Sequence, residues 1–209
     1  MSAPVIDVAW YQRPFPGETV CGDAVGSFQT PGGLWLVIAD GLGHGPTAHA
    51  AASPALRLVS ELAHSGASLP VHSDNPAITL DQVLRTIHDH LKGTVGAAVG
   101  LAFLETVTGI LRFVGVGNTA LRRLGSADTR LVSRDGVVGQ RLPSPRPAEM
   151  SLLKGDLILF TSDGVTERFG IDDYPGLRSD SAATVSRSVV ERFGRRHDDA
   201  TCLALRYGA

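Results

Sequence analysis

Four short segments of the chain place aspartate at or just beyond the end of an apolar run. They are Gly22-Asp23, Ile38-Ala39-Asp40-Gly41, Phe160-Thr161-Ser162-Asp163-Gly164 and His197-Asp198-Asp199-Ala200-Thr201. A single Asp-Gly step after a strand is ordinarily a turn. Four such carboxylates gathered at one edge of a sheet would repel one another unless a cation lay between them. The repeated pattern therefore favours a metal centre.

The donor types indicate which metal. Aspartate-rich, water-filled sites suit hard ions such as Mg²⁺ or Mn²⁺, whereas zinc uses Cys and His more heavily. We therefore expect a magnesium or manganese site.

Each aspartate also has a simpler interpretation. Asp40 could cap a helix that begins near Pro46, but it follows an apolar run and precedes a glycine-rich turn, which favours the metal role. Asp163 comes directly after an apolar strand, and burying its carboxylate there costs free energy unless the carboxylate binds a partner. Spacing alone does not separate Asp198 from Asp199, because a chain reversal also tolerates two aspartates.

Strands and helices must position these residues. Apolar, β-branched and aromatic runs bounded by turn residues predict strands at residues 5–11, 34–39, 97–105, 110–116, 120–124, 157–161 and 201–207. Helical periodicity predicts helices at residues 46–65, 79–92 and 180–193. Pro54 should kink or restart the first helix, and Thr79 with Gln82 has capping-box spacing at the second.

The order of these elements does not alternate strictly between strand and helix, so it indicates an α+β fold with sheets and helices in layers. The hairpin loop between residues 105 and 110 predicts adjacent antiparallel strands. The two common glycine-rich nucleotide motifs are missing from the sequence. With 209 residues and 22.0 kDa, we expect a single domain over residues 1–209.

Charge and composition exclude several classes of protein. The 19 Lys and Arg residues stand against 21 Asp and Glu, which argues against a dedicated nucleic-acid binder. The longest apolar run, residues 93–104, is too short to cross a bilayer, and the N-terminus does not resemble a secretory signal. Two cysteines provide no disulfide framework, so we expect a reducing, cytoplasmic location and no membrane partner.

The ordered motifs resemble the PPM (type 2C) metal-dependent protein phosphatases over residues 19–207. The branch related to SpoIIE and RsbU is the most similar, and within it the stand-alone stressosome phosphatases of the RsbX type. The motifs are Gly22-Asp23, Ala39-Asp40-Gly41-x-Gly43-His44-Gly45, Gly115-x-Gly117-Asn118-Thr119, Ser162-Asp163-Gly164-x-x-Glu167 and Asp198-Asp199-Ala200-Thr201.

This resemblance implies two antiparallel sheets packed face to face, with helices on both outer faces. It implies that Asp40 bridges two metal ions and that the Gly41 carbonyl binds one of them. Asp163 and Asp198 complete the ligand set, Asp23 holds metal-bound water, and Asp199 is a hydrogen-bonding neighbour within the metal site.

The resemblance also implies a reaction. Two divalent ions roughly 3.5–4 Å apart can share a water, lower its pKa and clamp an in-line displacement at phosphorus. Water would then attack phosphoserine or phosphothreonine directly, and neither cysteine begins a C-x₅-R phosphatase signature. The expected substrate is a phosphorylated STAS-domain protein of a stressosome or an anti-anti-sigma factor, and the expected state is a monomer.

Some positions depart from the better-known family members. Gly22 stands where they carry a second acidic residue, and Glu18 stands where they carry a phosphate-binding arginine, so Arg13 becomes a candidate for that role. Glu167, His44 and Asn118 are outer candidates whose alternative is a purely structural or surface role.

Two other functions remain open at this point. A phosphatase-shaped binding module would be favoured by loss of the metal aspartates, but they are present. A hydrolase of small phosphorylated metabolites would need an enclosed pocket, and residues 169–179 are the only obvious substrate-contacting flap.

Overall fold

A computed structural model describes residues 4–66, 79–166 and 168–208, which form two five-stranded antiparallel sheets. The first sheet has the order β1 (Ile6–Arg13), β10 (Ala200–Tyr207), β9 (Leu157–Thr161), β6 (Ala120–Leu124) and β7 (Thr129–Val132). The second has the order β2 (Asp23–Thr30), β3 (Gly33–Gly41), β4 (Ala97–Glu105), β5 (Ile110–Val116) and β8 (Ala148–Ser151).

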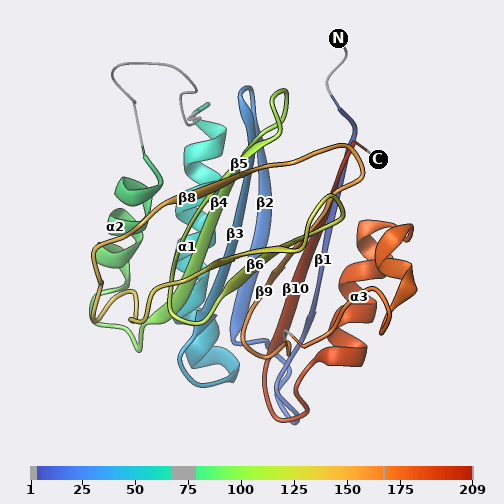
Figure 1. Ribbon diagram of the computed structural model, residues 1–209. Helices are drawn as coiled ribbons and strands as arrows, with labels where there is room; N and C mark the ends of the chain where they lie inside the picture. Colours follow the sequence, from blue (N-terminus) through green and yellow to red (C-terminus); the bar gives the residue numbers. More distant parts are fainter. Residues whose placement is uncertain (1–3, 67–78, 167, 209) are drawn as a thin grey trace.

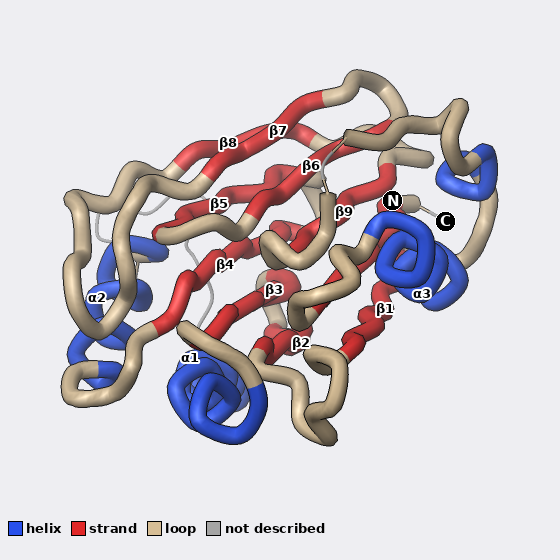
Figure 2. The backbone as a smooth tube through the Cα atoms, turned by 90° about the horizontal axis from the view of Figure 1, so that it is seen from below, coloured by secondary structure: helices blue, strands red, loops and turns tan. Residues whose placement is uncertain are grey.

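The two sheets pack face to face and helices cover their outer faces (Figures 1 and 2). Helices α1 (Gly45–His64) and α2 (Leu80–Leu91) lie on the second sheet, and α3 (Ala182–Phe193) lies on the first. A short 3₁₀ helix, η1 (Pro175–Arg178), precedes α3. The predicted αββα sandwich is therefore confirmed.

Strand β3 shows how the sequence builds these layers. Trp35 and Val37 belong to the apolar cluster under α1 and α2, whereas Leu36 and Ile38 belong to the cluster between the sheets. All four side chains are fully buried, because both faces of the strand are covered. Alternate residues pointing to opposite faces explain why this strand is apolar without interruption.

All seven predicted strands are present, and the 105–110 hairpin joins β4 and β5 in antiparallel register. Strands β2, β7 and β8 were not predicted. Strand β2 begins at an aspartate and contains Gly26, Ser27 and Gln29, which weaken its strand pattern. Strands β7 and β8 are four-residue edge strands that are largely exposed, so no apolar run marks them.

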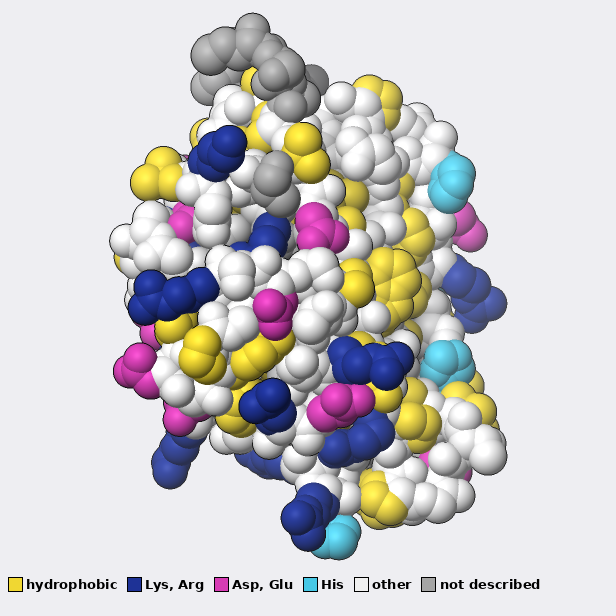
Figure 3. Space-filling view, turned by 90° about the vertical axis from the view of Figure 1, so that its right-hand side faces the viewer, with side chains coloured by type: hydrophobic (Ala, Val, Ile, Leu, Met, Phe, Trp, Pro, Cys, Tyr) yellow, Lys and Arg dark blue, Asp and Glu magenta, His cyan; other side chains and the backbone are white. Residues whose placement is uncertain are grey.

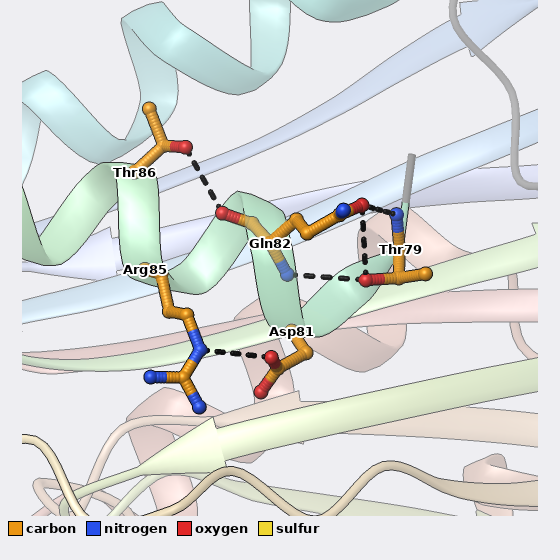
Figure 4. A network of polar contacts seen from close by, with 5 residues as sticks. All are labelled: Thr79, Asp81, Gln82, Arg85 and Thr86. Carbon is orange, nitrogen blue, oxygen red and sulfur yellow. Dashed lines mark hydrogen bonds and ion pairs between the residues drawn. The ribbon is translucent and has the colours of Figure 1, made fainter. Parts of the chain in front are cut away.

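The helices agree with the prediction, except that no new helix starts at Pro54. Helix α1 continues through Pro54 without restarting, because buried alanines on either side, including Ala52 and Ala55, hold it against β2 and β3. Helix α2 has the predicted capping box: Thr79 Oγ1 accepts from the Gln82 amide, and the Gln82 side chain accepts from the Thr79 amide (Figure 4).

The surface on the side that carries α3 has acidic and basic side chains interspersed (Figure 3). In the described part of the chain, no helix is both long and apolar enough to cross a membrane. Cys21 and Cys202 are both free thiols.

Candidate metal centre

Asp23 and Asp40 lie opposite each other across the β2–β3 ladder. Asp23 opens β2 and is buried, and Asp40 is the second-last residue of β3. Directly opposed residues have Cβ atoms about 4.5–5.5 Å apart, so like charges in such a pair destabilise the sheet. The pair places two carboxyl groups at one end of the second sheet.

The first sheet brings further carboxylates to the same place. Asp163 follows β9, and Asp198 precedes β10. Together with Asp40 they line one open cavity of about 200 Å³, whose other wall residues are Leu42, Gly43, Ala98 and Asn118. Three of the predicted ligands, distant in the sequence, therefore converge between the two sheets.

The electrostatics of this site favour bound positive charge. Burial, the charges of Asp23 and Asp163, and a hydrogen bond to Asp163 raise the pKa of Asp40 to about 10. Burial also raises the pKa of Asp23 to about 6, although hydrogen bonds from Thr201 and Ser162 oppose this shift. Burial and the charge of Asp163 raise the pKa of Asp198. At neutral pH the Asp40 carboxyl group, with a pKa of about 10, therefore holds a proton unless a cation neutralises the site.

The donor set fits a hard divalent ion. Asp23 Oδ1 is buried and has no hydrogen-bond partner within the described residues. No group of three or more acidic, histidine or cysteine side chains forms a ready-made cage in residues 4–66, 79–166 and 168–208. Mg²⁺ usually keeps several waters and binds through one or two carboxylates, so carboxylates beside an open cavity are compatible with it.

Gly41 lets helix α1 approach the end of β3. A Cβ at this position would lie 2.0 Å from the carbonyl oxygen of Ala48 on α1. The helix N-cap is His44, so Asp40 is not its cap. The glycine after Asp40 is thus required by the close packing of α1.

Asp199 is not in the wall of the cavity. Its Oδ1 accepts a 2.8 Å hydrogen bond from the Phe15 amide, and its Oδ2 lies 2.6 Å from where a Cβ at Gly22 would be. A side chain at position 22 would therefore displace the Asp199 carboxylate and would also crowd the Ala48 Cβ, which lies 2.9 Å away. These contacts give a physical reason for the glycine at position 22.

Comparisons with known proteins identify the family. The profile of stage II sporulation protein E (SpoIIE) matches residues 30–208, which is most of the chain. The chain belongs to the SpoIIE family. A search of the curated proteins finds no significant match.

Solved structures share the fold of this SpoIIE-family chain. A chain from a structural study of the bacterial stressosome has a TM-score of 0.82 and 27% identity, with 97% of this chain and 100% of that chain covered. RsbX in complex with magnesium has a TM-score of 0.78 and 18% identity, with 97% and 95% covered. The PP2C phosphatase domain of SpoIIE from Bacillus subtilis has a TM-score of 0.76 and 18% identity, with 99% and 65% covered. By family and fold, the chain is a PPM-type serine/threonine phosphatase.

The outer candidates of this SpoIIE-family chain lie in different places. His44 stacks on Phe15, with ring centroids 4.2 Å apart, and pairs with Glu18 at 2.8 Å, so its contacts are internal. Arg13 donates to the carbonyl oxygens of Val190 and Arg195 at the end of α3, and is not in the cavity wall. Glu167 lies outside the described residues.

Two site residues were undervalued or missed. Asn118, an outer candidate whose alternative was a structural role in its turn, lines the cavity and donates a hydrogen bond to Asp163 Oδ2. Arg195, which was not predicted, lies near enough to Asp198 for its charge to favour the ionised carboxylate. It stands three residues before Asp198, and the Arg195-Arg196 pair just before the acidic motif is the sequence signal that could have revealed it.

Proposed function

We propose that this phosphatase hydrolyses phosphoserine or phosphothreonine on a bacterial signalling protein, with two Mg²⁺ or Mn²⁺ ions as cofactors. The observation that carries the proposal is the convergence of Asp40, Asp163 and Asp198 on one open cavity. Each comes from a different strand end, and their mutual repulsion within this small volume is the cost that bound cations would remove.

The residues have distinct roles in this proposal. Asp40 would bridge the ions, the Gly41 carbonyl would bind one of them, and Asp163 and Asp198 would complete the ligands. Asp23 would hold bound water, with Asp199 as the neighbour that fixes the N-terminal segment through Phe15. When bound, the ions would supply charge neutralisation and a bridging water of lowered pKa for direct attack on phosphorus.

Asn118 would orient Asp163, because its amide donates to one oxygen of that carboxylate and leaves the other for a ligand. Arg195 would supply positive charge at the rim of the cavity. No protein nucleophile is needed in this scheme.

The proposed substrate is a phosphorylated STAS-domain protein of a stressosome, with an anti-anti-sigma factor as the related alternative. Support comes from the neighbour drawn from the bacterial stressosome, which matches over almost the whole of both chains. The cavity is open to solvent, which favours a protein loop over an enclosed metabolite. We further propose one catalytic domain over residues 1–209, acting as a cytoplasmic monomer without nucleic-acid or membrane partners.

A phosphoester assay tests the proposal. Wild-type protein should hydrolyse p-nitrophenyl phosphate only with Mn²⁺ or Mg²⁺ present, and Asp40→Asn and Asp163→Asn should each reduce turnover by about 100-fold or more. Asp89→Asn, on the exposed face of α2, is the matched control because it removes a carboxylate that only pairs with Lys92. Circular dichroism should show the same fold in all four proteins.

Equal turnover in wild type, Asp40→Asn and Asp163→Asn would overturn the two-metal proposal. Turnover that is unaffected by EDTA would overturn it as well. The substrate class needs a separate assay, in which phosphate release is followed from phosphorylated STAS-domain proteins and from a phosphorylated anti-anti-sigma factor.

A further inference from the structure

A second cavity adjoins the carboxylate cavity and shares two of its wall residues, Asn118 and Asp163. Its volume is about 450 Å³, and it too is open to solvent. Three arginines line it: Arg130 on β7, Arg168 after β9, and Arg195 after α3. We call this cavity the arginine groove.

The described residues that line the groove carry net positive charge. Asp163, at the boundary with the carboxylate cavity, is the one acidic residue in its wall among the described residues. Arg195 lies close enough to Asp198 for the two charges to attract each other. Positive charge therefore extends from the groove to the rim of the site where a phosphoryl group would be bound.

Arg195 is held in place by its backbone. Its amide donates to the Gly164 carbonyl at 2.7 Å, and its own carbonyl accepts from the Arg13 guanidinium. Its side chain is exposed, as is that of Arg168, and neither side chain forms an ion pair within the described residues. Within the described residues, two guanidinium groups are thus presented beside the site without a carboxylate in direct ion-pair contact.

We propose that the arginine groove binds acidic side chains next to the phosphorylated residue of the protein substrate. This inference rests on the proposed function, because the phosphorylated residue itself would lie in the neighbouring carboxylate cavity. Guanidinium groups bind carboxylates through two parallel hydrogen bonds, and a cavity of this size accommodates several side chains rather than one small ion.

Peptide binding tests the groove without requiring turnover. The probes are a fluorescein-labelled phosphoserine peptide flanked by glutamates and the same peptide flanked by glutamines. By fluorescence anisotropy, wild type should bind the glutamate peptide about tenfold more tightly, and the difference should shrink at high salt. The Arg168→Gln/Arg195→Gln double variant should lose this preference, whereas Arg168→Lys/Arg195→Lys should keep part of it.

Arg57→Gln is the matched control, because Arg57 is an exposed arginine on α1, outside the groove. It should bind both peptides as wild type does. Equal preference for the glutamate peptide in wild type and in the double glutamine variant, with melting temperatures unchanged, would overturn the proposal.

Turnover separates this inference from the proposed function. The ratio of kcat/KM for the glutamate and glutamine peptides should fall about tenfold in the double glutamine variant. If wild type hydrolyses both peptides with the same kcat/KM, and the variants do too, the groove proposal is wrong and the phosphatase stands. If wild type hydrolyses neither the peptides nor p-nitrophenyl phosphate, yet the double glutamine variant loses the binding preference that wild type shows, the proposed function is wrong and the groove stands.

Discussion

The hydroxyl group of Ser162 donates a 2.7 Å hydrogen bond to Oδ2 of Asp23 and thereby joins the ends of the two sheets. Ser162 follows β9 in the first sheet, and Asp23 opens β2 in the second. The same hydroxyl accepts a 3.1 Å hydrogen bond from the Thr201 amide in β10. One small, buried side chain thus fixes three strand ends around the carboxylates.

Ser162→Ala should therefore destabilise the protein. It leaves the buried Thr201 amide unpaired and removes one donor from Asp23, which should cost about 1–3 kcal/mol in the free energy of unfolding. Urea denaturation measures this loss. Ser179→Ala, at an exposed serine, should change stability by less than about 0.5 kcal/mol. If Ser162→Ala is as stable as this control, the two hydrogen bonds of Ser162 make no net contribution to the free energy of unfolding.

Asn118→Ala should weaken metal binding more than it weakens the fold. The Asn118 amide donates a hydrogen bond to one oxygen of Asp163. Loss of such an orienting partner lowers metal affinity by roughly 10- to 100-fold. The Mn²⁺ concentration for half-maximal turnover should rise accordingly, while the melting temperature in EDTA changes little. An unchanged Mn²⁺ requirement would assign Asn118 a role in its turn alone.

Gly41→Ala should disturb the packing of α1 on β3. The new Cβ would meet the Ala48 carbonyl at 2.0 Å, so the helix must move, at a cost of about 1–3 kcal/mol in the free energy of unfolding. Gly170→Ala is the matched control because nothing lies within 4 Å of its Cβ position and its φ is not positive. Chemical denaturation measures the free energy of unfolding of both variants. Equal stabilities would mean that α1 adjusts freely.

The strand-end aspartates could be found from the sequence because each follows or precedes a strong apolar run, as at Asp40 and Asp163. The partners that complete their environment carry no such signal. Asn118 and Arg195 reach the site only because β6 and β10 flank β9 in one sheet, and this neighbourhood is set by long-range pairing rather than by local sequence. Helix α1 also does not restart at Pro54, because tertiary packing of α1 overrides the local preference of proline.

Removal of divalent cations should make stability fall as the pH rises. In the folded chain the pKa of Asp40 is raised to about 10 and that of Asp23 to about 6, by burial and by neighbouring carboxylates. In the unfolded chain both carboxyl groups lose their protons near the ordinary aspartate pKa of about 3.9. The folded state therefore binds more protons above that pH, so the stabilisation is complete below it and is lost as the pH rises through the folded-state values.

Scanning calorimetry in EDTA between about pH 5 and about pH 9 should show this as a falling melting temperature, and Mg²⁺ should raise that temperature most at high pH, where the carboxylates lack protons. Asp40→Asn should flatten the pH dependence and reduce the Mg²⁺ effect, because it removes the carboxyl group with the highest pKa of the site. Asp89→Asn should behave as wild type does, since Asp89 is exposed and pairs only with Lys92. A melting temperature in EDTA that rises with pH in wild type, with no difference from Asp40→Asn, would mean that the clustered carboxylates do not strain the metal-free fold.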